Sequence, residues 1–233
     1  MQVISKINTI DWGLVDYLTA WQRQQQIFDS KVSRKLIHSR DAQNDSILTL
    51  DNDFILCQHP HVYTLGRNGN LHNLLISDQQ LRAIGATFVK IDRGGDITYH
   101  GPGQIVGYPI FDLESLNLGL KAYINRLEQL IIDVIALYGI KGDRLEGATG
   151  VWLDPDTPNA RKIAAIGVRA SRFVTMHGFA LNVNTDLKYF SYINPCGFVD
   201  KGVTSMAEEL GTEIDINEVK QQIFQHAKHI FTL

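Results

Sequence analysis

Residues 93–104, RGGDITYHGPGQ, place four glycines and one proline between stretches that have the pattern of β-strands. The simplest interpretation is a hairpin connection in which glycine supplies positive φ angles. The spacing of Gly101, Gly103 and Gly107 does not match the dinucleotide fingerprint, and no Gly-Lys-Ser/Thr ending marks a phosphate-binding loop. Glycine within strands also marks places where a ligand approaches the backbone. A hairpin has no need of the arginine, histidine and glutamine here, so we interpret the stretch as part of a binding site.

The composition of the chain excludes several classes of protein. The 233 residues carry 22 lysines and arginines against 25 aspartates and glutamates, and this balance gives no reason to expect nucleic acid as a partner. No apolar run reaches membrane-spanning length, and the first ten residues lack the pattern of a signal peptide. Two cysteines are too few for a disulfide scaffold. We therefore expect a cytoplasmic protein with free thiols, a monomer in which residues 1–233 form a single domain.

Helices and strands are interspersed along the sequence. Helical periodicity predicts long helices over residues 11 to about 30, 120–138 and 216–231, and a capping box at Ser77 and Gln80 predicts a short one. Short β-prone runs predict strands at SILTL (46–50), DFILCQ, VYTLG, ATFVKID, IVGYPIFDL, GVWLD, KIAAIGVRA and RFVTMHGFALNVN. Hairpin-like pairs among these strands predict an α+β fold, a mixed β-sheet flanked by helices.

Five segments carry a resemblance to a known family. RGGDITYHGPGQIVGYPIFDL at 93–113 closely resembles the signature of the lipoyl(octanoyl) transferases, the lipoate-protein ligase B family. In the same order and spacing, QHPHVYTLGRNG at 58–69, RKIAAIGVR at 161–169, HGFALNVNTDL at 177–187 and INPCGFVDKGVTSM at 193–206 resemble further segments of this family. The resemblance covers roughly residues 50–210 and implies the catalytic-domain fold of biotin and lipoate protein ligases.

The resemblance also implies an activity. The family transfers an octanoyl or lipoyl group from acyl carrier protein to a specific lysine of lipoyl domains, the first step of endogenous protein lipoylation. Octanoyl-acyl carrier protein would be the donor, and the acceptors would be lipoyl domains of 2-oxoacid dehydrogenase complexes and the H protein of the glycine cleavage system. A cysteine forms a thioester acyl-enzyme, and a lysine acts as acid and base. No cofactor is implied, neither ATP nor metal, because the phosphopantetheine arm enters with the donor.

The family pattern assigns roles to individual positions. Its catalytic cysteine falls on Cys196 and its catalytic lysine on Lys162, and we add His177 as a supporting residue. Its substrate-binding residues fall on three segments, namely Arg93, Gly94, Gly95, Asp96, Ile97, Thr98, Tyr99 and His100, then Ala165, Ile166 and Gly167, then Gly178, Phe179 and Ala180.

The residues themselves leave alternatives at both catalytic positions. A lone loop cysteine can be inert, but the neighbours of Cys196, a proline and a glycine, impose a turn that exposes it, and a thiolate suits thioester exchange. Cys57 lies in an apolar run and is interpreted as a buried packing residue. Lys162 is either a strand-end lysine with its ammonium in water, or a desolvated amine with a lowered pKa that exchanges protons near neutral pH.

Three further features have two interpretations each. His59 and His61 have the spacing of a metal pair, but no acidic or cysteine ligand is near them in sequence, and we expect no metal there. The basic residues between 161 and 172, with no acidic residue among them, are either a solvated face or a docking patch for acidic carrier domains. The glycines either pack the sheet tightly or admit a slim acyl chain, and the second interpretation predicts that Gly94→Val or Gly178→Val blocks the chain without unfolding the protein.

Three other functions compete with acyl transfer from acyl carrier protein. An ATP-dependent lipoate or biotin ligase of the same fold needs no nucleophilic cysteine, so the segment around Cys196 disfavours it. An octanoyl amidotransferase between carrier proteins also uses a cysteine and differs only in its donor. A non-catalytic module that binds carrier domains would not need both Cys196 and Lys162.

Overall fold

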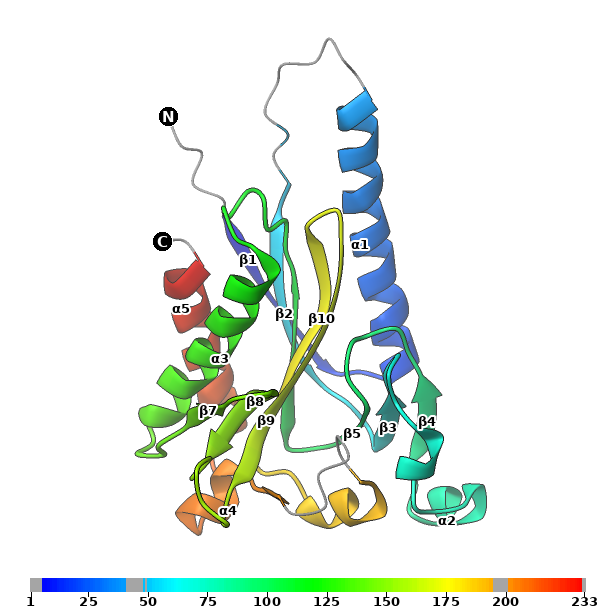
Figure 1. The fold of residues 1–233 in the computed structure, drawn as a ribbon, viewed down its shortest axis with the longest axis vertical. Coiled ribbons are helices and arrows are strands. Elements are labelled where there is room, and N and C mark those ends of the chain that lie inside the picture. Colours follow the sequence, from blue (N-terminus) through cyan, green and yellow to red (C-terminus); the bar gives the residue numbers. More distant parts are fainter. Residues whose placement is uncertain (1–5, 41–47, 49, 195–200, 232–233) are drawn as a thin grey trace.

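The computed structural model describes residues 6–40, 48, 50–194 and 201–231, which form two β-sheets and the helices around them (Figure 1). The larger sheet has the strand order β1-β2-β6-β10-β9-β8-β7, with β11 paired to β9, and the smaller has the order β4-β3-β5. The strands are β1 (Ile7–Leu14), β2 (Asn52–Gln58), β3 (Val62–Leu65), β4 (Thr87–Lys90), β5 (Ile97–His100), β6 (Gln104–Ile110), β7 (Asp143–Leu145), β8 (Ala148–Leu153), β9 (Arg161–Ser171), β10 (Val174–Asn182) and β11 (Gly202–Val203).

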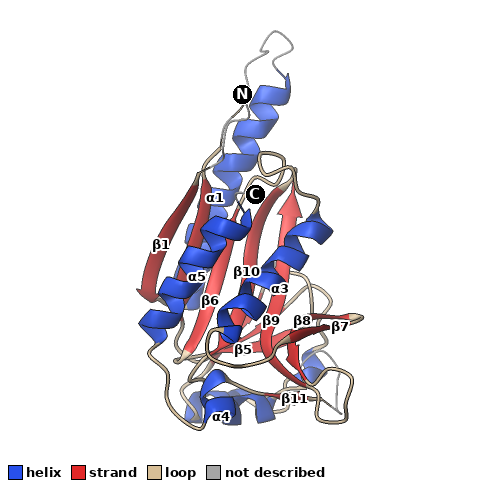
Figure 2. Ribbon diagram, turned by 90° about the vertical axis from the view of Figure 1, so that its left-hand side faces the viewer, coloured by secondary structure: helices blue, strands red, loops and turns tan. Residues whose placement is uncertain are grey.

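Helices cover both faces of the larger sheet. They are α1 (Tyr17–Arg40), α2 (Asp78–Ala83), α3 (Leu120–Ala136), α4 (Met206–Leu210) and α5 (Ile216–Phe231), with 3-10 turns η1 (Leu71–Asn73) and η2 (Leu187–Tyr192). Helices α3 and α5 lie side by side on one face, and α1 lies on the other (Figures 1 and 2). The β1–β2 pair is parallel and the β2–β6 pair antiparallel, so the predicted mixed sheet with flanking helices is confirmed. Among the described residues, no helix combines the length and apolar composition that crossing a membrane requires.

The first predicted helix was wrong over its first six residues, 11–16. Residues 11–14 belong to β1, which pairs with β2 and is irregular near Gly13, where φ is +62°. Helix α1 starts only after Asp16, whose carboxylate accepts the backbone N–H of Thr19 at 3.0 Å, and it continues ten residues beyond the predicted end. The helical spacing of apolar residues was a poor guide here, because Leu14 and Leu18, two residues that define it, do not pack in the core. They are 65% and 46% exposed.

Most other elements follow the sequence pattern. The capping box at Ser77 and Gln80 is present in α2, and α5 has the predicted bounds. The predicted strand at 46–50 lies largely outside the described residues, and its described residues 48 and 50 are not in a strand. Sequence periodicity missed β1, β7, β11 and α4, which are too short or irregular to carry a clear period. Ser205, which accepts the backbone N–H of Glu208 at 3.2 Å, was the one signal for α4.

The glycine-rich stretch is not a hairpin. It contains β5 of the smaller sheet and leads into β6 of the larger one, so residues 101–103 carry the chain from one sheet to the other. A β-carbon on Gly101 would lie 1.9 Å from the Tyr99 hydroxyl, and Gly103 has a φ of +79° beside the Asn184 carbonyl. These two glycines allow the crossing. The crossing places residues 93–98 over the larger sheet, where they border a cavity.

Candidate functional site

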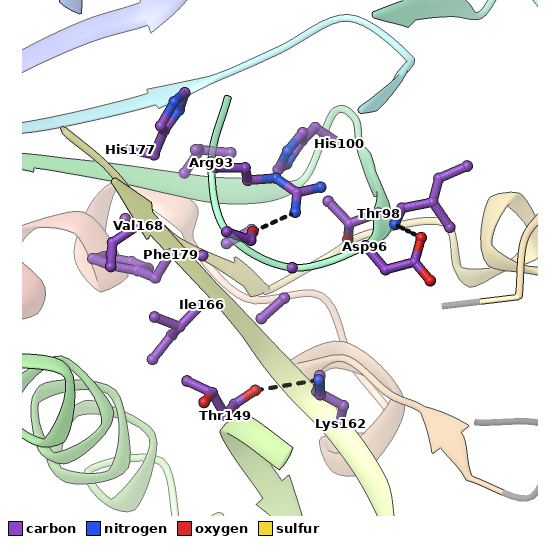
Figure 3. Close-up of a pocket in the computed structure, with 18 of the residues that line it drawn as sticks. Arg93, Asp96, Thr98, His100, Thr149, Lys162, Ile166, Val168, His177 and Phe179 are labelled. Atoms are coloured by element: carbon purple, nitrogen blue, oxygen red, sulfur yellow. Dashed lines mark hydrogen bonds between the residues drawn. The ribbon is translucent and has the colours of Figure 1, made fainter. Parts of the chain in front are cut away.

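A cavity of about 690 Å³ lies where the glycine-rich stretch crosses strands β9 and β10 (Figure 3). It is lined by Lys162, by His177 and by all but one of the predicted substrate-binding residues, namely Arg93, Gly94, Gly95, Asp96, Ile97, Thr98, His100, Ala165, Ile166, Gly167, Gly178, Phe179 and Ala180. Segments about 70 residues apart in sequence thus meet at one site. Its volume suits a small-molecule ligand, and much of its lining is apolar.

Arg93 anchors the loop that covers the cavity. Its guanidinium is largely buried and donates to the Thr64 carbonyl at 2.8 Å, to the Thr64 hydroxyl at 3.0 Å and to the Gly94 carbonyl at 3.0 Å. The next amide, of Gly94, donates to the Val168 carbonyl on β9 at 3.0 Å. A β-carbon on Gly167 would lie only 2.9 Å from the Gly94 carbonyl, so glycine at 167 permits this close approach.

Asp96 fixes the other end of the same loop. One carboxylate oxygen accepts the backbone N–H groups of Ile97 at 2.7 Å and Asn70 at 3.1 Å, and the other accepts the side-chain amide of Asn73 at 2.5 Å. The Asn73 carbonyl in turn accepts the backbone N–H of Asn194 at 2.9 Å. The turn η1 therefore connects the cavity loop with the described residue that precedes segment 195–200.

Tyr99 is the predicted substrate-binding residue that does not line the cavity. It points to the opposite side of β5, where it is fully buried and its ring stacks on Tyr189 with centroids 4.9 Å apart. Its hydroxyl pairs with the Nδ1 of His61 at 2.7 Å. Because neighbouring strand residues face opposite sides, Thr98 and His100 reach the cavity and Tyr99 supports the wall from behind. Tyr99 is therefore not placed to contact a substrate in the cavity.

Two cavity histidines are held in the neutral form. Burial is the largest influence on each and lowers the pKa of His100 well below its ordinary value and that of His177 in the same direction. His100 pairs through Nδ1 with the Gln104 side-chain oxygen at 2.8 Å and stacks on Tyr17, with ring centroids 5.6 Å apart. Neutral rings beside Val106 make the wall suited to an uncharged chain.

His177 has an unusual backbone and an unsatisfied nitrogen. Its φ is +60°, rare for a residue with a β-carbon, and its Nε2 bonds to the Asp92 carboxylate at 2.8 Å. The hydrogen bond from His177 lowers the pKa of Asp92, which also forms an ion pair with Arg169. The Nδ1 of His177 is buried and has no partner, although the residue lines the cavity. His177 borders the cavity, and its supporting role stays a prediction.

Lys162 lies at the part of the cavity farthest from His177 in Figure 3. It is half-buried near the start of β9, and its Nζ donates to the Thr149 carbonyl at 3.3 Å. The Nζ also lies 4.6 Å from the ring centroid of Trp152, over the ring. The side chain is half-buried and its hydrogen bond to Thr149 is exposed, so the choice between the two sequence interpretations stays a prediction. The side chain enters a partly enclosed site.

Cys196 lies outside the described residues, so its geometry cannot be compared with the prediction. The residues that follow its segment are described. Strand β11 runs parallel to the start of β9, with Gly202 opposite Arg161 and Val203 opposite Lys162, and both of these β11 residues line the cavity. The amide of Thr204 donates to the Lys162 carbonyl at 3.0 Å. The chain that leaves the cysteine segment therefore runs directly beside Lys162.

The structure argues against a docking patch made by all four basic residues of 161–172. Arg161 pairs with Glu209 at 2.6 Å and with Asp154 at 2.5 Å, and Arg169 pairs with Asp92. These three carboxylates lie outside residues 161–172 in the sequence. The lack of acidic residues within that segment therefore did not mean that its arginines are unpaired.

Cys57 on β2, and His59 and His61 in the turn after it, pack and hydrogen-bond within the protein. Cys57 is fully buried, as expected of a packing residue, and burial raises the pKa of its thiol. His59 bonds to the Val15 carbonyl and to the Tyr108 hydroxyl, each at 2.7 Å, while His61 bonds to Tyr99. The two histidines thus have separate partners. In the part of the chain that the structure describes, no group of three or more potential metal ligands occurs.

The two glycines chosen as probes of acyl entry differ sharply. A β-carbon on Gly94 would meet only the Val168 carbonyl, at 3.3 Å, which small shifts can relieve. A β-carbon on Gly178 would lie 2.2 Å from the backbone oxygen of Gly107 and 2.6 Å from a ring carbon of Pro109. The expectation that Gly178→Val still folds is therefore wrong, because the clash is with the neighbouring strand and not with a ligand.

Sequence reasoning missed several cavity residues. Tyr17, Val106 and Tyr108 come from α1 and β6, Leu120 and Ile124 from the first turns of α3, and Thr149 and Trp152 from β8. Their types are common in any core, and only the fold brings them to the cavity. No local signal could have selected them.

Comparisons with known proteins show the family to which the chain belongs. The family model of the lipoyl protein ligase A/B catalytic domain matches residues 16–228, and the chain belongs to this family. Within it, the chain is 59% identical over 214 residues to an octanoyltransferase of Bacteroides thetaiotaomicron, covering 92% of this chain and 90% of the relative. The chain is thus an acyltransferase of the octanoyltransferase group.

Solved structures support the fold. A bipartite lipoate protein ligase studied with its E2 lipoyl domain from Thermoplasma acidophilum matches with a TM-score of 0.67 at 12% identity, covering 97% of this chain and 84% of that one. A biotin protein ligase of Aquifex aeolicus, solved with biotin and ATP, matches with a TM-score of 0.50 at 11% identity, covering 97% and 70%. The predicted biotin and lipoate protein ligase fold is therefore confirmed.

Proposed function

We propose that the protein transfers an octanoyl or lipoyl group from acyl carrier protein to a lysine of a lipoyl domain, through a thioester on Cys196. The name of the relatives, octanoyltransferase, supports the acyl group. The observation that carries the proposal is that one cavity is lined by Lys162, by the glycine-rich loop and by residues 201–203, which follow the cysteine segment. A proton carrier and an acyl-binding wall then border the same cavity as the residues that follow the cysteine segment.

The first half-reaction forms the acyl-enzyme. At rest, Lys162 carries the proton of the Cys196 thiol, which leaves a thiolate beside an ammonium, the arrangement that activates a cysteine. The thiolate attacks the carbonyl of the octanoyl thioester. A bond forms to the Cys196 sulfur, the bond to the phosphopantetheine sulfur breaks, and the Lys162 ammonium gives its proton to that leaving sulfur. The products are free carrier thiol, octanoyl-Cys196 and a neutral Lys162.

The second half-reaction uses the neutral amine that the first one leaves. The acceptor lysine attacks octanoyl-Cys196 as a neutral amine, and its surplus proton passes to Lys162. The carbon–sulfur bond breaks, an amide forms, and the thiolate–ammonium pair is restored. Because an amide replaces a thioester, the transfer needs no ATP, and we propose that neither ATP nor a metal takes part.

The cavity walls support an uncharged, slender acyl group. The glycines of the loop and of β9 let backbone approach backbone closely, and the neutral rings of His100 and Tyr17 face the same space. Backbone N–H groups in the glycine-rich loop could also stabilise the oxyanion of the tetrahedral intermediate. We further propose that the acceptors are lipoyl domains of 2-oxoacid dehydrogenase complexes and the glycine cleavage H protein.

A donor comparison tests this function. The enzyme is mixed with an unmodified lipoyl domain and one of three donors, which are octanoyl-acyl carrier protein, an octanoylated H protein, or free octanoate with ATP and magnesium. The mass of the lipoyl domain is then recorded. The proposal predicts modification with octanoyl-acyl carrier protein alone, in the presence of EDTA. Modification only from the H protein would identify an amidotransferase, and modification only with octanoate and ATP would identify a ligase.

A further inference from the structure

We propose that Trp152 is a positioning residue that holds the side chain of Lys162 in its ammonium form at the cavity. The inference rests on the proposed function in so far as it concerns transfer, and it deepens the role of Lys162. It starts from the contact between the Lys162 ammonium and the indole ring, which lie 4.6 Å apart, from Nζ to ring centroid. Both residues line the cavity.

The ring is fixed in place by its surroundings. Trp152 and Lys162 are opposite each other on the antiparallel strands β8 and β9. The Trp152 side chain is only 2% exposed, and its indole N–H donates to the Ala148 carbonyl at 2.8 Å. A buried ring that is hydrogen-bonded at its edge cannot turn away. Its face therefore stays available to the lysine.

A second group of contacts holds β8, the strand whose Thr149 carbonyl accepts the Lys162 ammonium. Gly150 has a φ of +131°, which residues with a β-carbon rarely adopt, and its N–H donates to a Glu128 carboxylate oxygen at 3.1 Å. The Glu128 side chain is 8% exposed and pairs with Arg144 at 3.0 Å. This clamp fixes the preceding carbonyl, of Thr149, which accepts the Lys162 ammonium at 3.3 Å.

Both contacts distinguish the charged from the neutral amine. The negative face of an indole ring attracts a cation and offers much less to a neutral amine, and tryptophan is the strongest of the aromatic residues in this respect. The contact therefore favours the protonated state of Lys162. A carbonyl acceptor also prefers an ammonium donor. Lys162 is thus kept charged in the resting enzyme, where a thiolate would need it.

A purely structural role for Trp152 makes a different prediction. If the ring only fills space, any change that keeps its shape leaves the ionisation of Lys162 as it was. Fluorine atoms on the indole keep the shape almost unchanged and weaken the negative face in steps. A series of one to four fluorines at position 152 therefore separates the two roles. The same analogues at Trp12, which contacts Arg23 and not Lys162, form the matched control.

The direct readout is the reactivity of the Lys162 amine. The protein is treated briefly with acetic anhydride between pH 7 and 10, and acetylation of Lys162 is measured by mass spectrometry relative to the exposed Lys121. Only the neutral amine reacts, so the tetrafluoro analogue at 152 is expected to increase the relative rate about three- to tenfold near pH 8. The intermediate analogues should fall in order. Equal rates in all analogues would overturn the proposal, and the control series at Trp12 should show no trend.

A second readout concerns catalysis. The alkaline limit of the rate of acylation by octanoyl-acyl carrier protein should move to lower pH in step with the fluorine series, by up to about one unit. A uniform loss of rate with an unchanged pH profile would overturn the proposal. The acetylation result does not depend on transfer. If the acetylation trend is present and Lys162→Ala transfers octanoyl at the wild-type rate, the proton-carrying role of Lys162 in the proposed function fails and the effect of Trp152 on Lys162 stands.

Discussion

Lowering the pH from 7 to 5 should destabilise the folded protein by about 2 kcal/mol through His59 alone. His59 is fully buried, and its neutral ring is satisfied by the Val15 carbonyl and the Tyr108 hydroxyl. Burial lowers the pKa of His59 from 6.5 to about 4. The folded pKa is thus depressed, so the stability that His59 contributes is complete above pH 6.5 and is lost as the pH falls toward 4.

The magnitude follows from the difference in proton binding. At pH 5 the unfolded chain has bound a proton at His59 and the folded protein has largely not. The separation between 6.5 and 5 is one and a half pH units, and at about 1.4 kcal/mol for each unit it amounts to about 2 kcal/mol. His100 and His177, whose pKa values burial also lowers, add to the loss in the same direction.

Urea unfolding at pH 7, 6 and 5 measures the effect, with His59→Gln as the comparison. The variant loses stability at every pH because it loses contacts, but it also lacks the titrating ring. Its stability should therefore fall less between pH 7 and 5 than that of the wild type, by about 2 kcal/mol. An equal fall in both proteins would show that His59 does not carry the acid sensitivity and would refute the reasoning.

Three further outcomes are expected. Gly94→Val should fold and lose octanoyl transfer, whereas Gly178→Val should fail to fold, as circular dichroism and the transfer assay would show; a folded Gly178→Val protein would contradict the predicted backbone clash. Glu209→Gln should lower the free energy of unfolding by about 1–3 kcal/mol and slow transfer, because it weakens the paired hydrogen bonds to Arg161 that hold β9 beside α4. Unchanged thermal unfolding of this variant would contradict the prediction. Transfer should proceed without ATP and in EDTA, and its abolition by EDTA would indicate a metal.

The larger part of the fold could be predicted because the periodicity was strong. The apolar face of α5 and the capping box of α2 are local properties that tertiary contacts did not override. The errors occurred where local pattern and packing disagree. Residues 11–14 have helical spacing but continue a strand beside β2, because the sheet edge offers hydrogen bonds that the spacing does not reveal. That residues 1–233 form a single domain stays a prediction.

The sequence predicted several of the segments that line the cavity, but it did not predict the shape of the cavity. The motifs located Arg93, Lys162 and Gly178, yet the direction of each side chain depends on the strand on which it lies. Tyr99 illustrates this, because one position along β5 separates a residue behind the wall from His100 inside the cavity. The sequence predicts Trp152 only as part of a strand, because its contact with Lys162 depends on the register of β8 and β9.

A covalent octanoyl intermediate at Cys196 is the central step of the proposed reaction. The protein is mixed with octanoyl-acyl carrier protein in the absence of acceptor and ATP, its intact mass is recorded, and the adduct is located by peptide mapping. We expect one octanoyl group, on Cys196, in the wild type and in Cys57→Ala, and none in Cys196→Ala. In Lys162→Ala, acylation should be slower by about 10²–10⁴-fold. An adduct at another residue, or transfer at the wild-type rate by Cys196→Ala, would contradict the account.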